Sequence, residues 1–290
     1  MSPAEGRVLA NGVEFAYLEE GRGPLALCLH GFPDSAWTYR HLLPALSAAG
    51  FRAVAPWMRG YAPTAVPADG RYQTGALGLD ACALHEALGG DGEAVIIGHD
   101  WGAMATYIAA NHEPERWRRV VTMAVPPAGA VAGGFMQYRQ LKKSWYMFFF
   151  QHGLSDVVVG MDDLAFIDGL WADWSPGYDA GVDLPHVKDA LRDPANLAAA
   201  LGYYRATLGG IGVDPALDHV QNAGSAPTAQ PTLYLHGRTD GCMGVELAEA
   251  AAPFLTSEGS RLELVDGAGH FLHVENPDEV NRLIVDFVAE

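Results

Sequence analysis

Positive charge is scarce in this sequence. Its 290 residues include 18 Lys and Arg against 35 Asp and Glu, which gives a net charge of −17. The only lysines are Lys142, Lys143 and Lys188, and the arginines are scattered along the chain. Proteins that bind nucleic acids present clustered basic residues to the phosphates, so we expect no nucleic-acid partner. An acidic surface of this kind favours solubility and repels anions.

Cysteine is also rare, and long apolar runs are absent. Cys28, Cys82 and Cys242 are an odd number, which does not suit a disulfide framework and fits a reducing compartment. No segment approaches the roughly 20 apolar residues that are needed to cross a bilayer. Residues 1–6 lack the charged start and apolar run of a signal peptide. We therefore expect a cytoplasmic protein that does not contact membranes.

The remaining composition allows one large folded unit. Hydrophobic residues make up 49% of the chain, which is enough for a large core in one domain with an insertion. Residues 8–10 and 13–18 are two short strand-like runs on either side of Asn11-Gly12. Because both turn residues tolerate positive φ, we expect a β-hairpin here.

Beyond the hairpin, short apolar strands alternate with helical segments. We expect strands at residues 25–29, 52–55, 94–97, 120–125, 232–235 and 262–265, and helices at 37–48, 77–88, 103–110 and 245–254. A last helix is expected from Pro277, with Asn276 as its cap and Glu279 in the capping-box position. Strands that are apolar on both faces are typical of a mostly parallel sheet covered by helices on both faces.

The alternation stops between Pro126-Pro127 and Ala226-Pro227. This stretch contains many aromatic residues and helical runs but few strand patterns, and a strand precedes and follows it. We interpret it as a helical cap inserted into the sheet domain. Residues 127–226 would then form the cap, and residues 1–126 and 227–290 would form the α/β core.

One five-residue stretch is the most informative part of the chain. Gly98-His99-Asp100-Trp101-Gly102 follows an apolar strand and precedes a helical run. A strand, a sharp turn and a helix, with glycine two residues to either side of the central residue, form a nucleophile elbow. The central residue is Asp100 rather than serine, and a carboxylate attacks an sp3 carbon without first losing a proton. This pattern therefore favours the opening of an epoxide or the displacement of a halide.

Two later loops offer the other catalytic groups. Asp240 follows the strand at 232–235, and His270 follows Gly269 just past the last strand. Parallel sheets place ligands at the carboxyl ends of their strands. The order nucleophile, acid, base is the order found in α/β-hydrolases. We therefore assign His270 as the general base and Asp240 as the acid that orients it.

Other residues compete for these two roles. Asp266 and Glu246 are weaker candidates for the orienting acid. Four other histidines are candidates for the base: His273, His236, His99 and His30. The Gly-x-Gly-His setting after the last strand favours His270, and we interpret His273 as a supporting or structural residue.

The turn at residues 30–33 is a candidate oxyanion hole. His30-Gly31-Phe32-Pro33 follows the strand at 25–29, and in this kind of fold that turn supplies a backbone N–H. The residue after the nucleophile supplies a second one. We therefore assign the main-chain amides of Phe32 and Trp101 to this role.

At these positions the chain resembles the epoxide hydrolases of the α/β-hydrolase fold, of the bacterial soluble type, over nearly its whole length. The resemblance implies two cap tyrosines that hydrogen-bond the epoxide oxygen. The family pattern Tyr-x-x-x-Phe-Gln occurs at residues 146–151 and points to Tyr146. An Asn-Trp-Tyr-Arg-like segment at residues 202–205 points to Tyr204, with Tyr203 as its rival.

The chain departs from the family pattern in two places. The usual Asp-x-Arg-Gly reads Trp57-Met58-Arg59-Gly60, and the first tyrosine is followed by Met147 rather than Gln. Both differences bear on the shape of the pocket more than on the mechanism. We expect the substrate pocket to include Phe32, Trp101, Trp145 and Met147.

The resemblance implies an epoxide hydrolase that converts an apolar epoxide and water to a vicinal diol through a covalent ester on Asp100. This chemistry requires no metal and no organic cofactor. The expected partner is the small-molecule substrate, and the sequence leaves open whether the protein forms a homodimer.

Two rival functions remain at this point. A haloalkane dehalogenase uses the same Asp nucleophile, and Trp101 could donate its indole N–H to a halide. Against it, dehalogenases usually carry Asn where Phe32 stands. The other rival is a non-catalytic α/β-hydrolase that binds a small molecule, although the three catalytic positions are chemically intact.

Overall fold

The chain opens with the hairpin that its sequence predicts. In the computed structural model, which describes residues 3–290, β1 (Ala4–Ala10) pairs antiparallel with β2 (Val13–Gly21). Asn11 and Gly12 have φ values of 45° and 74°, and a two-residue hairpin turn of type I′ needs positive φ at both positions.

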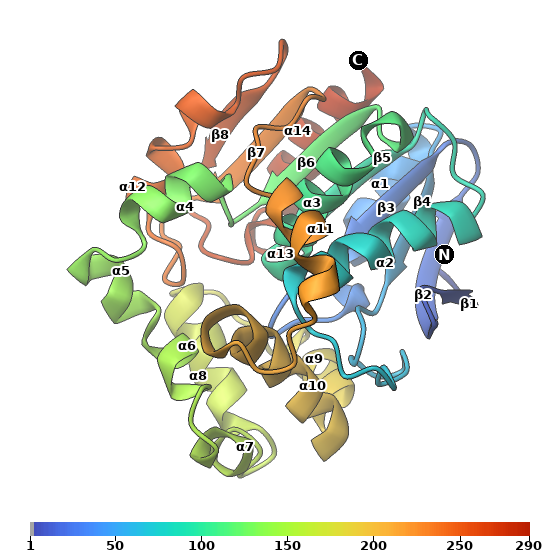
Figure 1. Ribbon diagram of the computed structural model, residues 1–290. Coiled ribbons are helices and arrows are strands. Elements are labelled where there is room, and N and C mark those ends of the chain that lie inside the picture. The colour runs from blue at the N-terminus through green and yellow to red at the C-terminus, as the bar shows by residue number, and fades with distance from the viewer. Residues whose placement is uncertain (1–2) are drawn as a thin grey trace.

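The hairpin forms one edge of a single eight-stranded sheet (Figure 1). The strand order is β1-β2-β4-β3-β5-β6-β7-β8, and every neighbouring pair beyond β2–β4 is parallel. The other strands are β3 (Leu25–Leu29), β4 (Arg52–Pro56), β5 (Val95–His99), β6 (Arg119–Met123), β7 (Thr232–Gly237) and β8 (Arg261–Val265). The predicted, mostly parallel sheet is confirmed.

Helices cover both faces of this sheet (Figure 1). α1 (Leu42–Ala48) and α14 (Pro277–Ala289) pack on one face, and α2 (Thr74–Ala87) and α3 (Trp101–His112) pack on the other. The two faces therefore have separate apolar cores.

The central strand β5 contributes to both cores. Ile96 belongs to the core under α2 and α3, whereas Val95 and Ile97 belong to the core under α1 and α14. Successive side chains of a strand point to opposite faces of the sheet. Because successive residues of β5 are apolar, both faces of the sheet must be covered at this strand. Full burial of each such side chain contributes about 1.5–3 kcal/mol. The strand that carries the elbow is thus firmly held.

Between β6 and β7, the described chain forms helices and no strand. These helices are α4 (Ala128–Gly134), α5 (Tyr138–Lys143), α6 (Trp145–Phe149), α7 (Leu154–Val158), α8 (Ala165–Trp174), α9 (Leu184–Leu191), α10 (Pro194–Tyr204), the π-helix η3 (Arg205–Gly209), the 3-10 helix η4 (Pro215–Leu217) and α11 (Asp218–Ala223). α6 to α10 lie together below the sheet in Figure 1, and α5 lies at the left, between α4 and α6. α11 instead contacts α2 and α3. The division into a cap at 127–226 and a core stays a prediction.

Two predicted helices are interrupted by proline. The segment at 37–48 is a 3-10 helix followed by α1, because Pro44 has no N–H to donate to the carbonyl four residues earlier. The segment at 245–254 is α-helical only in its first half and gives way to a 3-10 turn at Pro253. The other helical elements of the described chain are η1 (Ala36–Arg40), η2 (Pro114–Arg116), α12 (Val245–Glu249), η5 (Ala252–Phe254) and α13 (Leu272–Glu275).

The start of the last helix agrees with the sequence only in part. α14 begins at Pro277, as predicted. Asn276 occupies the N-cap position, as predicted, but its side chain makes no capping hydrogen bond to the backbone, and its amide nitrogen donates to Glu279 Oε2 at 2.8 Å. Within residues 3–290, no helix has the length and apolar character needed to cross a membrane.

Candidate active site

The turn between β5 and α3 presents Asp100 in a strained conformation. Asp100 has φ 52° and ψ −118°, a region that costs a non-glycine residue about 1–3 kcal/mol. The flanking glycines make the turn possible. A Cβ at Gly98 would lie 2.2 Å from the carbonyl oxygen of Gly102, and one at Gly102 would lie 2.0 Å from that of Leu29. This conformation places the carboxylate at the carboxyl end of β5.

The two oxygens of the Asp100 carboxylate have different surroundings. Oδ1 accepts a hydrogen bond of 2.7 Å from the main-chain amide of Phe32. Oδ2 lies 3.7 Å from Nε2 of His270. Trp101, whose amide is the other predicted oxyanion donor, is the first residue of α3 and directly follows the carboxylate. The structure therefore brings Phe32, Trp101 and His270 to the nucleophile.

His270 and Asp240 form a buried pair behind the carboxylate. His270 Nδ1 lies 2.9 Å from Asp240 Oδ2, and both side chains are inaccessible to solvent. Asp240 Oδ1 accepts the main-chain amides of Cys242 and Met243 at 2.7 and 2.8 Å. These contacts hold the acid in one orientation.

Asp240 and His270 stabilise each other's charged forms. Burial alone would raise the pKa of Asp240, but the charge and hydrogen bond of His270 bring it below its ordinary value. Burial alone would lower the pKa of His270, but the charges of Asp240 and Asp100 and the hydrogen bond to Asp240 raise it to about 10. Both shifts favour an imidazolium at His270, between two carboxylates, in the resting protein.

One carbonyl from the helical segment joins the two catalytic loops. Trp174, the last residue of α8, accepts the amide of Gly241 and the amide of His270 on the same carbonyl oxygen, each at 3.0 Å. The next residue, Ser175, donates its hydroxyl to Glu275 at 2.6 Å. Asp240 and His270 are thus positioned from α8 as well as from the sheet.

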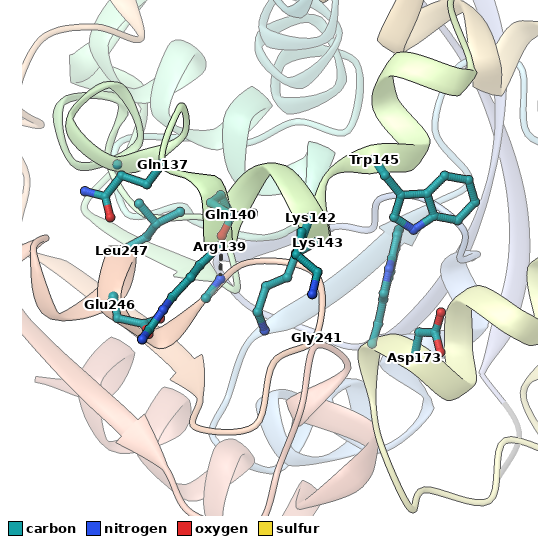
Figure 2. Close-up of a pocket in the computed structure, with 13 residues that line it drawn as sticks. Gln137, Arg139, Gln140, Lys142, Lys143, Trp145, Asp173, Gly241, Glu246 and Leu247 are labelled. Atoms are coloured by element: carbon teal, nitrogen blue, oxygen red, sulfur yellow. Dashed lines mark hydrogen bonds and ion pairs between the residues drawn. The ribbon is translucent and has the colours of Figure 1, made fainter.

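Helix α5 holds the acid loop from the other side (Figure 2). The side chain of Gln140 donates to the Cys242 carbonyl at 2.9 Å and accepts the Gly244 amide at 2.9 Å. Lys143 donates to the carbonyl of Asp240 itself. The sequence did not point to Gln140, and the only signal for Lys143 was that lysine is scarce in the chain.

Tyr146 and Tyr204 lie together over the elbow. Their ring centroids are 5.6 Å apart, and the ring of Tyr204 is 4.9 Å from that of Trp101. The hydroxyl of Tyr146 lies 3.2 Å from Cys242 Sγ. Burial raises the pKa of both phenols well above its ordinary value, and the charge of Asp100 adds to this. Both hydroxyls therefore stay protonated and can donate.

The structure separates Tyr204 from its rival. The hydroxyl of Tyr203 donates to the carbonyl of Arg59 at 2.8 Å, so its proton is already used. The hydroxyl of Tyr204 is buried and has no hydrogen-bond partner among the described residues. The indole N–H of Trp101 and Nε2 of His270 also have no hydrogen-bond partner among the described residues. Buried polar atoms without partners are rare in folded proteins. Two of these three belong to residues that line one cavity with Asp100, and the third lies 3.7 Å from its carboxylate, which indicates a ligand site.

A cavity of about 500 Å³ reaches this carboxylate. Its lining includes Asp100, Trp101, Tyr146, Met147 and Tyr204. The predicted nucleophile, both predicted epoxide donors and two of the predicted pocket residues thus meet at one cavity. The predicted base and its acid lie behind the carboxylate.

Trp145 and the Phe32 side chain are placed differently from the other predicted pocket residues. Trp145 is 45% exposed and lines a separate hollow of about 600 Å³, beside Asp173 and Lys143 (Figure 2). The ring of Phe32 is buried and packs edge-on against Tyr204 at 5.2 Å. The structure does not bring Trp145 together with the other predicted pocket residues.

The rival acids and two of the rival histidines have other partners. Asp266 pairs with Arg238 and Glu246 lies beside Arg139, both at exposed positions. His30 Nε2 accepts the amide of Met58 at 3.0 Å. His236 contacts the carbonyl of Met243 at 3.1 Å and the hydroxyl of Tyr234 at 2.8 Å.

Two groups of side chains could supply three metal ligands each within the described part of the chain. In one, ligand atoms of Asp240, Cys242 and His270 lie within 4.8 Å of one another, but the first and last already hydrogen-bond each other. In the other, Asp34, His99 and His273 are buried behind His270. His99 Nε2 donates to the carbonyl of His270 at 2.9 Å, so this group supports the catalytic loop.

Comparison with known proteins gives a consistent result. A family model described as alpha/beta hydrolase fold matches residues 24–157. The chain is 30% identical to Epoxide hydrolase of Caballeronia sordidicola, over 97% of this chain and 92% of that protein. It is 28% identical to Epoxide hydrolase A of Mycobacterium tuberculosis, over 99% of this chain and 98% of that one.

A solved structure shows the same architecture. The crystal structure of Epoxide Hydrolase A from Mycobacterium thermoresistibile superposes with a TM-score of 0.82 at 27% identity, and the match covers 99% of this chain and 98% of that one.

Proposed function

This chain belongs to the epoxide hydrolases of the α/β-hydrolase fold, and we propose that it converts an apolar epoxide to a vicinal diol through an ester on Asp100. It is a hydrolase that acts on epoxides, and its partner is a small-molecule epoxide. The observation that most supports the ester route is the different placement of the two oxygens of the Asp100 carboxylate. One of its oxygens is held by the Phe32 amide, and the other lies 3.7 Å from His270 Nε2.

In the first step, Asp100 Oδ2 attacks a ring carbon of the epoxide. A bond forms between Oδ2 and that carbon while the ring C–O bond breaks on the opposite side. The ring oxygen takes a proton from the hydroxyl of Tyr204 or Tyr146, both of which line the cavity. The product is a hydroxyalkyl ester whose carbonyl oxygen is Oδ1, still held by the amide of Phe32.

The second step removes the ester. His270 takes a proton from water, and the resulting hydroxide attacks the carbonyl carbon of the Asp100 ester. The amides of Phe32 and Trp101 stabilise the negative charge that develops on Oδ1. When the intermediate collapses, the Oδ2–Cγ bond breaks and the leaving oxygen takes the remaining proton of the attacking water. Oδ2 thus leaves as a hydroxyl of the diol, the oxygen from water stays on Asp100, and Asp100 is again a carboxylate.

The pKa of His270 fits these two steps. In the resting protein the carboxylates of Asp240 and Asp100 hold this pKa high. Ester formation removes the charge of Asp100, so the pKa of His270 falls. The proton that His270 then releases returns to the tyrosine that protonated the ring oxygen. The neutral imidazole then accepts a proton from water, which restores the imidazolium at the end of the cycle.

The cavity supports an apolar substrate. Its walls beyond the carboxylate include Met104, Val125, Val131 and Phe135. Burial of an apolar substrate against these side chains is favourable, at roughly 25 cal/mol for each Å² of apolar surface. The cytoplasmic location and a homodimer stay predictions.

A single turnover in heavy-oxygen water tests the ester route. With enzyme in excess over a styrene-oxide-like substrate, we expect the label in the Asp100 carboxylate and a first diol that is nearly unlabelled. Label in the first diol would mean direct attack of water on the ring and would reject the ester. As an internal control, multiple turnovers in the same water should label the diol.

Haloalkane dehalogenation is not favoured, since the named relatives are epoxide hydrolases. Release of halide from chloro- or bromoalkanes measures it directly. We expect no release above that of an Asp100→Asn variant.

A further inference from the structure

The cavity that reaches the nucleophile is almost free of charge. Asp100 is the only charged residue among the described residues that line it, although 18% of the chain is charged. A buried charge is costly unless an opposite charge or hydrogen bonds compensate it. The described residues that line the cavity therefore offer no opposite charge to an anionic group of a substrate.

Two apolar side chains mark where the cavity meets solvent. Met136, just after α4, and Leu208, in η3, both line the cavity and are 73% and 41% exposed. The rim also includes Asn222 on α11 and Ser225 after it, and both are uncharged. The remote end of a substrate whose epoxide lies at Asp100 would thus meet apolar or neutral polar groups.

No cation of the helical segment is among the described residues that line this cavity. Arg205 follows Tyr204 directly, but its guanidinium pairs with Asp156 at 2.8 Å. Lys142 and Lys143 line the other hollow (Figure 2). A carboxylate at the rim would therefore meet no cation among the described residues that line the cavity. It would also be repelled by the net charge of −17.

We infer that the substrate is an uncharged, mainly apolar epoxide whose remote end lies between Met136 and Leu208, and that the site rejects epoxides with a carboxylate at that end. This inference rests on the proposed function, because it assumes that the ring opens at Asp100. The site would reject such an epoxide because its carboxylate would have no opposite charge to pair with, and not because of a steric clash.

A matched pair of substrates tests this inference. One is an ω-epoxy fatty acid of medium chain length, and the other is its methyl ester, which has the same epoxide and the same chain. At low ionic strength and neutral pH we expect kcat/KM for the ester to exceed that for the acid by at least about tenfold. The difference should shrink as salt is added.

Two arginine variants separate the rim from the net charge. Leu208→Arg places a cation at the mouth and should raise the acid-to-ester ratio of kcat/KM by several-fold. Leu154→Arg adds the same charge at a position in α7 that is 53% exposed and lies outside the cavity lining. We expect this control to leave both activities and their ratio unchanged.

Three results would overturn the inference. The first is equal kcat/KM for the acid and the ester in the unmodified protein. The second is an equal rise of the ratio in both arginine variants, since net charge rather than the rim would then set the preference. The third is turnover of styrene oxide without turnover of either long substrate. If no epoxide at all is hydrolysed, the proposed function fails as well.

Discussion

The main-chain amide of Phe32 donates a 2.7 Å hydrogen bond to Oδ1 of Asp100, 68 residues further along the chain. The turn after β3 and the turn after β5 are thus joined at the nucleophile, because β3 and β5 are parallel neighbours that end side by side. The bond makes the two carboxylate oxygens unequal. Oδ1 is held in a donor site, and Oδ2 is left to attack.

We expect Tyr204→Phe to slow alkylation of Asp100 by about a hundredfold, since one donor to a developing oxyanion is worth about that much. Its thermal stability should not fall, because the hydroxyl removed has no hydrogen-bond partner within residues 3–290. Stopped-flow tryptophan fluorescence and a thermal melt measure the two effects. Tyr203→Phe is the matched control. It should lose stability, because the Arg59 carbonyl loses its donor, and should keep most of the alkylation rate.

We expect Gln140→Leu to weaken the acid loop. The buried carbonyl of Cys242 and amide of Gly244 would both lose their partner, which costs about 2–4 kcal/mol in unfolding free energy. Ester hydrolysis should slow more than ester formation, because Asp240 orients the base and not the nucleophile. Rapid-quench rates of the two steps test this. Gln140→Glu keeps the acceptor for Gly244 and should show a smaller loss. Equal slowing of both steps would contradict a positioning role.

We expect Asp100→Asn to lower the pKa of His270. The charge of Asp100 contributes to the raised pKa of His270, and the amide removes that charge as the ester does. A titration of the imidazole followed by NMR in both proteins measures the change. An unchanged pKa would contradict the proton cycle described above.

The raised pKa of His270 also predicts how stability depends on pH. A group whose pKa is higher in the folded state stabilises it fully below the unfolded pKa and loses this effect as pH rises through the folded pKa. For His270 that window runs from 6.5 to about 10. The difference in unfolding free energy between the unmodified protein and His270→Gln should therefore shrink across it. Denaturant titrations at the two ends of the window measure this, and a constant difference would contradict it.

Local sequence rules predict the frame of the site well. The glycines around Asp100 specify a tight turn, and the apolar runs specify buried parallel strands. The carboxyl ends of parallel strands meet at one edge, so the sequence alone places Phe32, Asp100, Asp240 and His270 close together. The helix breaks just before Pro44 and Pro253 also follow from local chemistry, although the apolar periodicity hid them.

Contacts from the helical segment could not be predicted in the same way. Gln140 and the carbonyl of Trp174 act through their position against loops that are distant in sequence, and no periodic pattern records such a position. Trp145 shows the same limit. Its neighbour Tyr146 faces the cavity, but successive residues of a helix point in directions about 100° apart, so Trp145 faces the other hollow.

The covalent ester is tested most directly by intact-protein mass spectrometry of the His270→Gln variant after brief exposure to an excess of styrene oxide. We predict a mass gain of one substrate molecule that peptide mapping places on Asp100. The gain should be absent from the Asp100→Asn, His270→Gln double variant. An unmodified mass under conditions where the unmodified protein turns over the same epoxide, or an adduct on another residue, would contradict the account.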